Sequence, residues 1–111
     1  MNWNILDSEE QLNNIIEESS SVPVLIFKHS TRCSISSMAK SRLERQWDLD
    51  ENSVKPYVLD LIANRNVSSK IEEVFSVQHE SPQALLIKKG ACVYNDSHNG
   101  ISVSEIGELL A

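Results

Sequence analysis

The feature that most constrains the fold is the apolar run from Val22 to Phe27, which is followed at once by polar residues. The run is rich in β-branched and large apolar side chains, a composition typical of a strand that is buried on both faces. A strand of this kind lies in the middle of a sheet that helices cover on both sides. Val22 to Phe27 therefore predicts an α/β fold.

A helix is expected soon after this strand, because the spacing of apolar residues changes from Ser34 onward. Cys33 falls at the junction between strand and helix, where backbone N–H groups lack partners and the helix dipole is positive. Both effects favour the thiolate, which is the nucleophilic form of cysteine, so this position suits thiol chemistry. The apolar residues at helical spacing are Ile35, Met38, Ala39, Leu43 and Trp47.

The rest of the chain alternates between strand and helix patterns. We expect a strand at 3–6, a helix capped by Asp7, a strand at 54–61, a helix capped by Asn66, strands at 84–87 and 92–95, and a last helix after Ser102. Strand–helix–strand crossovers make the central strands parallel, and the late hairpin adds antiparallel strands. The order βαβαβαββα thus predicts a mixed central sheet of four to five strands with helices on both faces.

Length and charge narrow the class of protein further. A chain of 111 residues fits one domain over residues 1–111. The longest apolar run is much shorter than the roughly 20 residues that span a bilayer, so no membrane partner is expected. The formal net charge of −6 argues against a nucleic-acid partner. The first residues lack the pattern of a signal peptide, so we expect a cytoplasmic protein.

The two cysteines, Cys33 and Cys92, do not make a disulfide framework and would stay as thiols in a reducing compartment. Cys92 lies in the predicted hairpin, where we expect it to pack as a small apolar residue. A disulfide needs the two Cα atoms within about 7 Å, and we expect these cysteines to be farther apart. The histidines have no ligand spacing, so no metal site is predicted. His98 is expected on a turn surface.

Charged and titratable residues near Cys33 leave two interpretations open. Lys28, Arg32 and Lys40 either put positive charge around the thiol or form an ordinary solvated face. His29 and His79 fall at the two ends of the proposed site, where a histidine that titrates near neutral pH would assist a thiolate. Each histidine is also explained as a polar residue at a strand end or in a loop.

The element order resembles the thioredoxin fold, with a cysteine starting the helix after the central strand and a proline before the third main strand. In that fold the equivalent proline is cis and lies beside the reactive cysteine. Ser81-Pro82 is the matching step here, so the resemblance predicts a cis bond, although only about 5–6% of such bonds in folded proteins are cis. It also implies that the Ser81 backbone presents its N–H and C=O to an incoming chain or thiol adduct.

Two separated motifs make the resemblance narrower: Phe-Lys-His-Ser-Thr-Arg-Cys-Ser-Ile-Ser at 27–36 and His-Glu-Ser-Pro-Gln-Ala at 79–84. Together they resemble the monothiol bacilliredoxin family, also called bacillithiol-system redox-active or YtxJ-like proteins. The resemblance implies thiol–disulfide exchange with Cys33 as nucleophile, no cofactor, bacillithiol or another low-molecular-weight thiol as co-substrate, and S-thiolated client proteins as partners. The substrate-binding residues that it implies are Thr31, Arg32, Ser34, Ser36, Ser81 and Pro82.

Ser34 and Ser36 set this chain apart from other redox motifs. Members of the family usually have proline straight after the cysteine, where proline presets the first helical turn and lacks an N–H. Ser34 restores that donor, which affects the redox tuning more than the fold. Ser36 stands where a dithiol motif has its second cysteine, so one thiol per turnover is expected.

Two other functions fit the same sequence. The domain would be a redox-silent binding or adaptor module if Cys33 were an ordinary thiol, since a fold does not fix activity. It would be an iron–sulfur carrier if it resembled monothiol glutaredoxins, which typically have the loop C-G-F-S. Bulky Ile35 in Cys33-Ser34-Ile35-Ser36 argues against the carrier.

Overall fold

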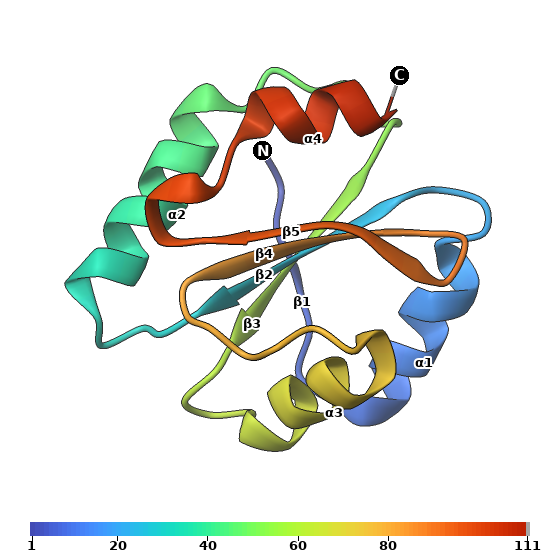
Figure 1. Cartoon of the computed structure of the whole chain (residues 1–111), viewed down its shortest axis with the longest axis horizontal. Coiled ribbons are helices and arrows are strands. Elements are labelled where there is room, and N and C mark those ends of the chain that lie inside the picture. Colours follow the sequence, from blue (N-terminus) through green and yellow to red (C-terminus); the bar gives the residue numbers. More distant parts are fainter. Residues whose placement is uncertain (111) are drawn as a thin grey trace.

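The computed structural model describes residues 1–110, which form one sheet with helices on both sides (Figure 1). The strands are β1 (Asn4–Ile5), β2 (Val24–His29), β3 (Lys55–Asp60), β4 (Gln83–Lys88) and β5 (Ala91–Ser97). The helices are α1 (Glu9–Glu18), α2 (Ser34–Gln46), α3 (Arg65–Phe75) and α4 (Val103–Leu110), with a 3-10 turn, η1 (His98–Gly100), before α4. The predicted order of elements is confirmed.

The five strands lie in the order β1-β3-β2-β4-β5, so β2 is central as the apolar run predicts. The pairs β1–β3 and β3–β2 are parallel, whereas β2–β4 and β4–β5 are antiparallel, which confirms the mixed sheet. Lys28 near the end of β2 pairs with Gln83 at the start of β4. The chain therefore leaves β2 toward Cys33 at the same edge of the sheet where Pro82 enters β4.

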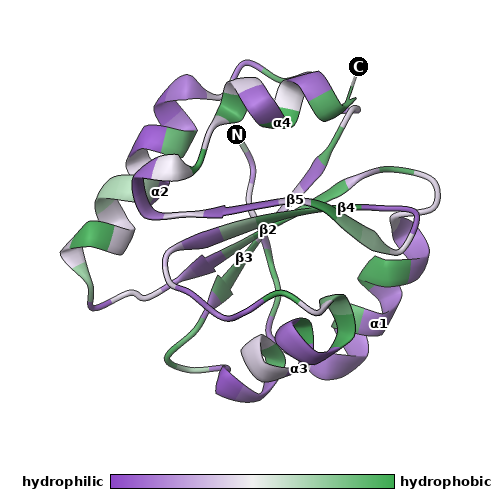
Figure 2. Cartoon of the chain, viewed as in Figure 1, coloured by the Kyte–Doolittle hydropathy of each residue, from purple (hydrophilic) through white to green (hydrophobic). Residues whose placement is uncertain are grey.

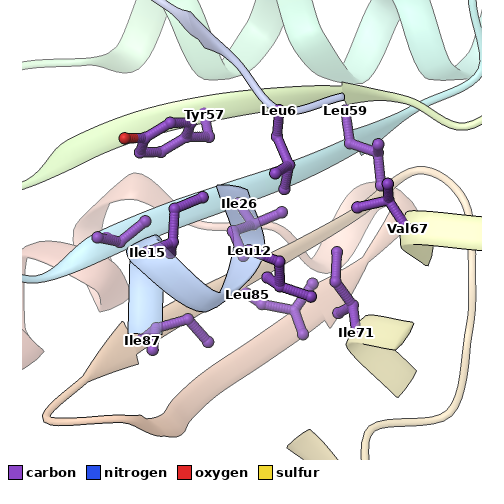
Figure 3. Packing of buried hydrophobic residues seen from close by; sticks show 11 residues of the cluster. Leu6, Leu12, Ile15, Ile26, Tyr57, Leu59, Val67, Ile71, Leu85 and Ile87 are labelled. Atoms are coloured by element: carbon purple, nitrogen blue, oxygen red, sulfur yellow. The ribbon is translucent and has the colours of Figure 1, made fainter. Parts of the chain in front are cut away.

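Alternate residues of β2 fill two separate hydrophobic cores. Val24 and Ile26 face the cluster formed with α1 and α3, part of which Figure 3 shows. Leu25 and Phe27 face the cluster formed with α2 and α4. All four side chains are buried, and full burial of such a side chain stabilises the fold by roughly 1.5–3 kcal/mol. Figure 2 shows the hydrophobic colour in the central strands and a hydrophilic β5.

Two helices begin at residues other than those predicted. Ser8, not Asp7, caps α1, and its Oγ accepts the N–H of Gln11 at 3.1 Å. The Gln11 Oε1 in turn accepts the N–H of Asp7 at 3.0 Å. The side chains of Ser8 and Gln11 thus form bonds similar to a capping box, one residue after the pair of Asp7 and Glu10. Asn64, not Asn66, precedes α3. None of the helices within residues 1–110 combines the length and the apolar composition of a membrane span.

Both tryptophans pack on the side of the sheet that α2 and α4 cover. The ring of Trp3 lies 5.9 Å from that of Phe27, and its Nε1 donates a hydrogen bond to Glu44 Oε2 at 2.7 Å. The Lys40 ammonium is 5.5 Å from the Trp3 ring centroid, within cation–π range. Trp47, just after α2, packs against the same cluster. These contacts fasten the start of the chain to α2.

Candidate functional site

Cys33 is the N-cap residue of α2, with the extended dihedrals φ −106° and ψ 120°. Its N–H donates to Ser30 O at 3.0 Å, and its carbonyl accepts the N–H of Ser37 at 3.1 Å. The side chain is half-buried, forms no capping hydrogen bond and is not in a disulfide. The backbone N–H groups of the first helical turn come next in the chain and favour negative charge at this end of the helix. The geometry thus leaves the sulfur available at the position that the sequence predicts.

Ser36 lies in the first turn of α2 and is fully buried, so it does not reach solvent beside Cys33. Its Oγ is 2.7 Å from His29 Nδ1 and accepts the N–H of Ser30 at 3.0 Å. These two bonds join the first turn of α2 to the end of β2 across the loop that carries Cys33. Ser36 is thus placed to support that loop from inside.

The His29 imidazole is held in its neutral form near pH 7. Burial lowers the pKa of His29, and the nearby Lys40 ammonium lowers it further, although Asp60 and Glu44 act in the opposite direction. A neutral ring supplies no positive charge to a thiolate. The sequence left open whether His29 assists as a cation, and this environment favours its role as a hydrogen-bond partner of Ser36.

The three basic residues expected near Cys33 do not form a common positive patch. Lys28 is fully buried within the sheet, which corrects the interpretation of it as a solvated residue. Lys40 pairs with Glu44 at 2.9 Å on the surface of α2. Arg32 is exposed next to Cys33. Since side chains alternate along a strand, Lys28 points to the face opposite His29.

Lys28 connects β2 to the loop that precedes β4. Its Nζ is 3.2 Å from His79 Nδ1 and donates to Ser68 O at 3.5 Å, while Ser68 Oγ is 3.2 Å from the same Nδ1. Burial lowers the pKa of Lys28 to about 8, and the charge of Glu72 opposes this shift. Sequence reasoning missed this cluster, although its signal was present: a lysine that continues the buried alternation of a central strand.

The Ser81–Pro82 peptide bond is cis, which confirms the prediction made from the thioredoxin resemblance. Pro82 is buried and Ser81 is half-buried. The Pro82 carbonyl accepts the N–H of His98 at 3.0 Å, so the turn η1 is tied to this segment. The pairing of β2 with β4 brings Ser81 and Pro82 to the same sheet edge as the loop of Cys33.

The other residues singled out in the sequence lie around Cys33, in β5 and in η1. Thr31, Arg32 and Ser34 are exposed around Cys33. Cys92 is half-buried in β5 against the cluster of α1 and α3, its Sγ donates to Tyr94 O at 3.2 Å, and burial raises its pKa. His98 is exposed in η1, as a turn residue should be. Among residues 1–110, no group of three or more His, Cys, Asp or Glu side chains is arranged to hold a metal ion.

A cavity of about 610 Å³ lies between α2 and η1, on the side of the sheet that α2 covers. Its wall includes Ile35 and Met38, which are 59% and 70% exposed although both are apolar. Arg42 and Arg45 line the same cavity, and Arg42 donates to the carbonyl of His98 at 2.9 Å. The wall of this cavity therefore combines exposed apolar side chains with two arginines.

Comparison with known proteins places this geometry in a family. The model of the monothiol bacilliredoxin BrxC family matches residues 4–106. A solved structure described as a proposed oxidoreductase with a thioredoxin fold is 34% identical over 94% of this chain and 89% of its own, with a TM-score of 0.79. Thioredoxin from Trypanosoma brucei brucei is 16% identical over 98% of this chain and 88% of its own, with a TM-score of 0.74. Malassezia sympodialis thioredoxin is 14% identical with the same coverage and TM-score.

Proposed function

Because the chain belongs to the monothiol bacilliredoxin family, we propose that it removes a low-molecular-weight thiol, bacillithiol, from mixed disulfides on client proteins. The observation that carries the proposal is the place of Cys33 at the N-terminus of α2, with its sulfur free and the Ser81–Pro82 segment at the same sheet edge. The family membership supports thiol redox function in general, and the choice of bacillithiol rests on the family name.

The reaction is two successive thiol–disulfide exchanges. In the first, the Cys33 thiolate attacks the sulfur of the thiol cap, the cap–client S–S bond breaks, and the client sulfur leaves with the electron pair as a thiolate. In the second, a free low-molecular-weight thiolate attacks the cap sulfur now bonded to Cys33. A small symmetric disulfide leaves, and the Cys33 thiolate is restored. Each step forms one S–S bond and breaks one, so no further oxidant or reductant is needed.

A single protein thiol suffices for this cycle. Ser36 occupies the position of a resolving cysteine, and its buried oxygen is engaged with His29 and Ser30. Cys92 lies in β5, where its thiol is packed against the core. The Cys33–cap disulfide is therefore resolved by a thiol from solution. A compartment that keeps thiols reduced suits this cycle, and we take it to be the cytoplasm.

The groups around Cys33 have different proposed roles in binding a substrate. Thr31, Arg32 and Ser34 are exposed beside the sulfur and offer polar contacts. The backbone of Ser81 before Pro82 is the platform for the extended part of the substrate. Ser36 supports the loop from inside. Ser34 takes the place of proline and adds one backbone N–H to the helix N-terminus, where it favours a thiolate.

The test is release of a bacillithiol cap from a model client protein, followed by mass spectrometry. The Cys33→Ser variant should lose release completely, down to the uncatalysed rate, because serine does not undergo thiol–disulfide exchange. The matched control is Cys92→Ser, which should keep the wild-type rate. Full activity in Cys33→Ser would refute the mechanism. If the wild-type protein fails to release the cap, the same fold would serve as a redox-silent adaptor.

A further inference from the structure

A second cavity, of about 440 Å³, lies on the other side of the sheet, beside α3. Its wall combines the apolar side chains of Leu61 and Ile62 with polar ones, which include Ser30, Arg65, Ser68, Glu72 and His79. Cavities of this size are within the range that binds small molecules in proteins. No step of the exchange proposed above involves this cavity.

The cavity is close to the reacting cysteine. Ser30 forms part of its wall, and the Ser30 carbonyl accepts the N–H of Cys33 at 3.0 Å. His79, which also lines the cavity, belongs to the loop that leads to Ser81 and Pro82. The wall therefore includes one residue from each of the two loops that would hold a thiol adduct on Cys33.

The buried Lys28 determines which hydrogen-bonding group His79 offers to this cavity. A protonated lysine has three donors and no acceptor, so its Nζ, 3.2 Å from Nδ1, must donate to that nitrogen. Burial and the charge of Lys28 lower the pKa of His79, which keeps its ring neutral. The single ring hydrogen is then on Nε2, at the far side of the imidazole from the buried contact. The His79 ring, which lines the cavity, thus carries its one N–H donor on the nitrogen that does not contact Lys28.

The wall combines groups of opposite charge. The Arg65 guanidinium and the His79 Nε2–H are donors that suit a carboxylate, and arginine is especially adapted to carboxylate geometry. The Glu72 carboxylate accepts the backbone N–H of His79 at 2.5 Å and has further acceptor positions for an amine or hydroxyl. The cavity between α2 and η1 has Arg42 and Arg45 in its wall but no carboxylate, so within the described residues it does not offer this combination of groups.

We propose that the cavity beside α3 binds the part of the small thiol that does not react, and that it recognises a carboxylate together with an amine or hydroxyl. This inference rests on the proposed function, since it assigns one half of the mixed disulfide to a specific side of Cys33. Arg65 holds the carboxylate, Glu72 faces the amine or hydroxyl, and Lys28 positions His79. Arg65 and Glu72 are thus specificity residues for the thiol cap.

Two different thiol caps on the same model client distinguish recognition of the cap by this cavity from the exchange activity in general. A glutathione cap carries carboxylates and an amine, whereas a 2-mercaptoethanol cap is uncharged. Arg65→Ala should raise KM about fivefold for the glutathione-capped client and leave KM for the mercaptoethanol-capped client unchanged, with kcat little affected. Arg65→Lys should retain part of the preference because it keeps the charge. Arg45→Ala removes an equal charge from the other cavity and should leave the preference between caps intact.

An equal rise in KM for both caps would show that Arg65 serves the client side, and no change for either cap would show that it serves neither; both results overturn the proposal. Binding of S-methylglutathione, which has no free thiol, tests the cavity without turnover. We expect its amide chemical-shift changes to centre on Arg65, Ser68 and Ser69 and to weaken about fivefold in affinity in Arg65→Ala. Changes centred on α2 and η1, or none, would overturn the proposal. Cys33→Ser should still bind this probe, so failure of exchange and failure of this site are distinguishable.

Discussion

Lys28 and His29 are consecutive residues at the end of β2, and they reinforce the site from opposite faces of the sheet. His29 turns toward α2, where Ser36 connects it to the loop of Cys33. Lys28 turns toward α3, where His79 connects it to the loop that precedes Pro82. One strand end therefore supports both the segment that carries the sulfur and the segment proposed to receive the substrate.

The two faces do this with different chemistry. On the α2 side, a hydroxyl and a neutral imidazole share a short hydrogen bond, and no net charge is buried. On the α3 side, an ammonium group is buried, and the cost of removing it from water appears as a pKa of about 8. The loop of Cys33 is therefore held at little electrostatic cost, whereas the loop before Pro82 is held by a group whose charge depends on pH.

The largest difference between the two faces is expected in the pH dependence of the free energy of unfolding, at alkaline pH. The pKa of Lys28 is 10.5 in an ordinary setting and about 8 in the fold, so the unfolded chain binds more protons between these values. Stability therefore rises with pH in this window, and below pH 8 the penalty is fully present. Relative to Lys28→Met, the wild-type free energy of unfolding should increase by up to about 3 kcal/mol between pH 8 and 10.5.

Urea unfolding followed by far-UV circular dichroism at several pH values measures this difference. Using the difference between the two proteins cancels contributions from other groups that titrate at alkaline pH. Lys88→Met is a matched control, because Lys88 is also in a strand but its Nζ donates to Leu109 O near the surface. Curves for wild type and Lys28→Met that run parallel across the window would contradict the burial of a charged Lys28.

A smaller effect is expected on the α2 side, where one hydroxyl serves two groups. Ser36→Ala leaves the Ser30 N–H and His29 Nδ1 without this partner, and loss of a buried hydrogen-bonding group costs about 1–3 kcal/mol. Ser37→Ala, at the adjacent exposed position of the same helix, should change stability by less than about 0.5 kcal/mol. Urea unfolding at pH 7 compares the two variants, and equal effects would remove the special role of Ser36.

The smallest effect is expected on the acid side, and both faces contribute to it. The pKa values of His29 and His79 are lowered from 6.5, so in acid the unfolded chain binds protons that the folded one does not yet bind. Stability should therefore fall as the pH drops below 6.5, and His29→Gln or His79→Gln should each reduce this fall. Thermal unfolding between pH 7.5 and 5 measures it. His98→Asn in the exposed turn η1 is the control, and an acid response unchanged in all three variants would contradict the assignment.

Much of the fold could be predicted because β2 is apolar on both faces and the residues after Cys33 change to helical spacing. These patterns reflect the burial of apolar side chains, which is the dominant favourable term in the free energy of folding. Buried positions recur at a regular spacing along a strand or helix, so the sequence shows them. The helix starts were less predictable. Asp7 and Ser8 are both good capping residues, and the choice between them depends on where Gln11 lies in space.

The place of Cys33 at the start of α2 and the cis bond before Pro82 were predictable, because one residue type in one position indicates each of them. The site was not predictable where a polar side chain is buried against distant elements. Lys28 precedes two polar residues, and sequence alone does not show that Ser68 and His79, 40 and 51 positions away, surround its ammonium group. Ser36 was expected beside the substrate because of its spacing from Cys33, and only the packing of α2 shows that it faces inward.

The positions of Trp3 and Trp47 determine what an optical experiment on this protein can detect. Both indoles pack on the side of α2 and α4, whereas the opposite core contains Tyr57, with Phe75 packed against it, and neither tryptophan. Tryptophan emission will therefore report changes around the helix that begins after Cys33. Events around Lys28 and α3 will be nearly silent in that signal. A protein that seems to change in one step by fluorescence can thus hide a separate transition on its other face.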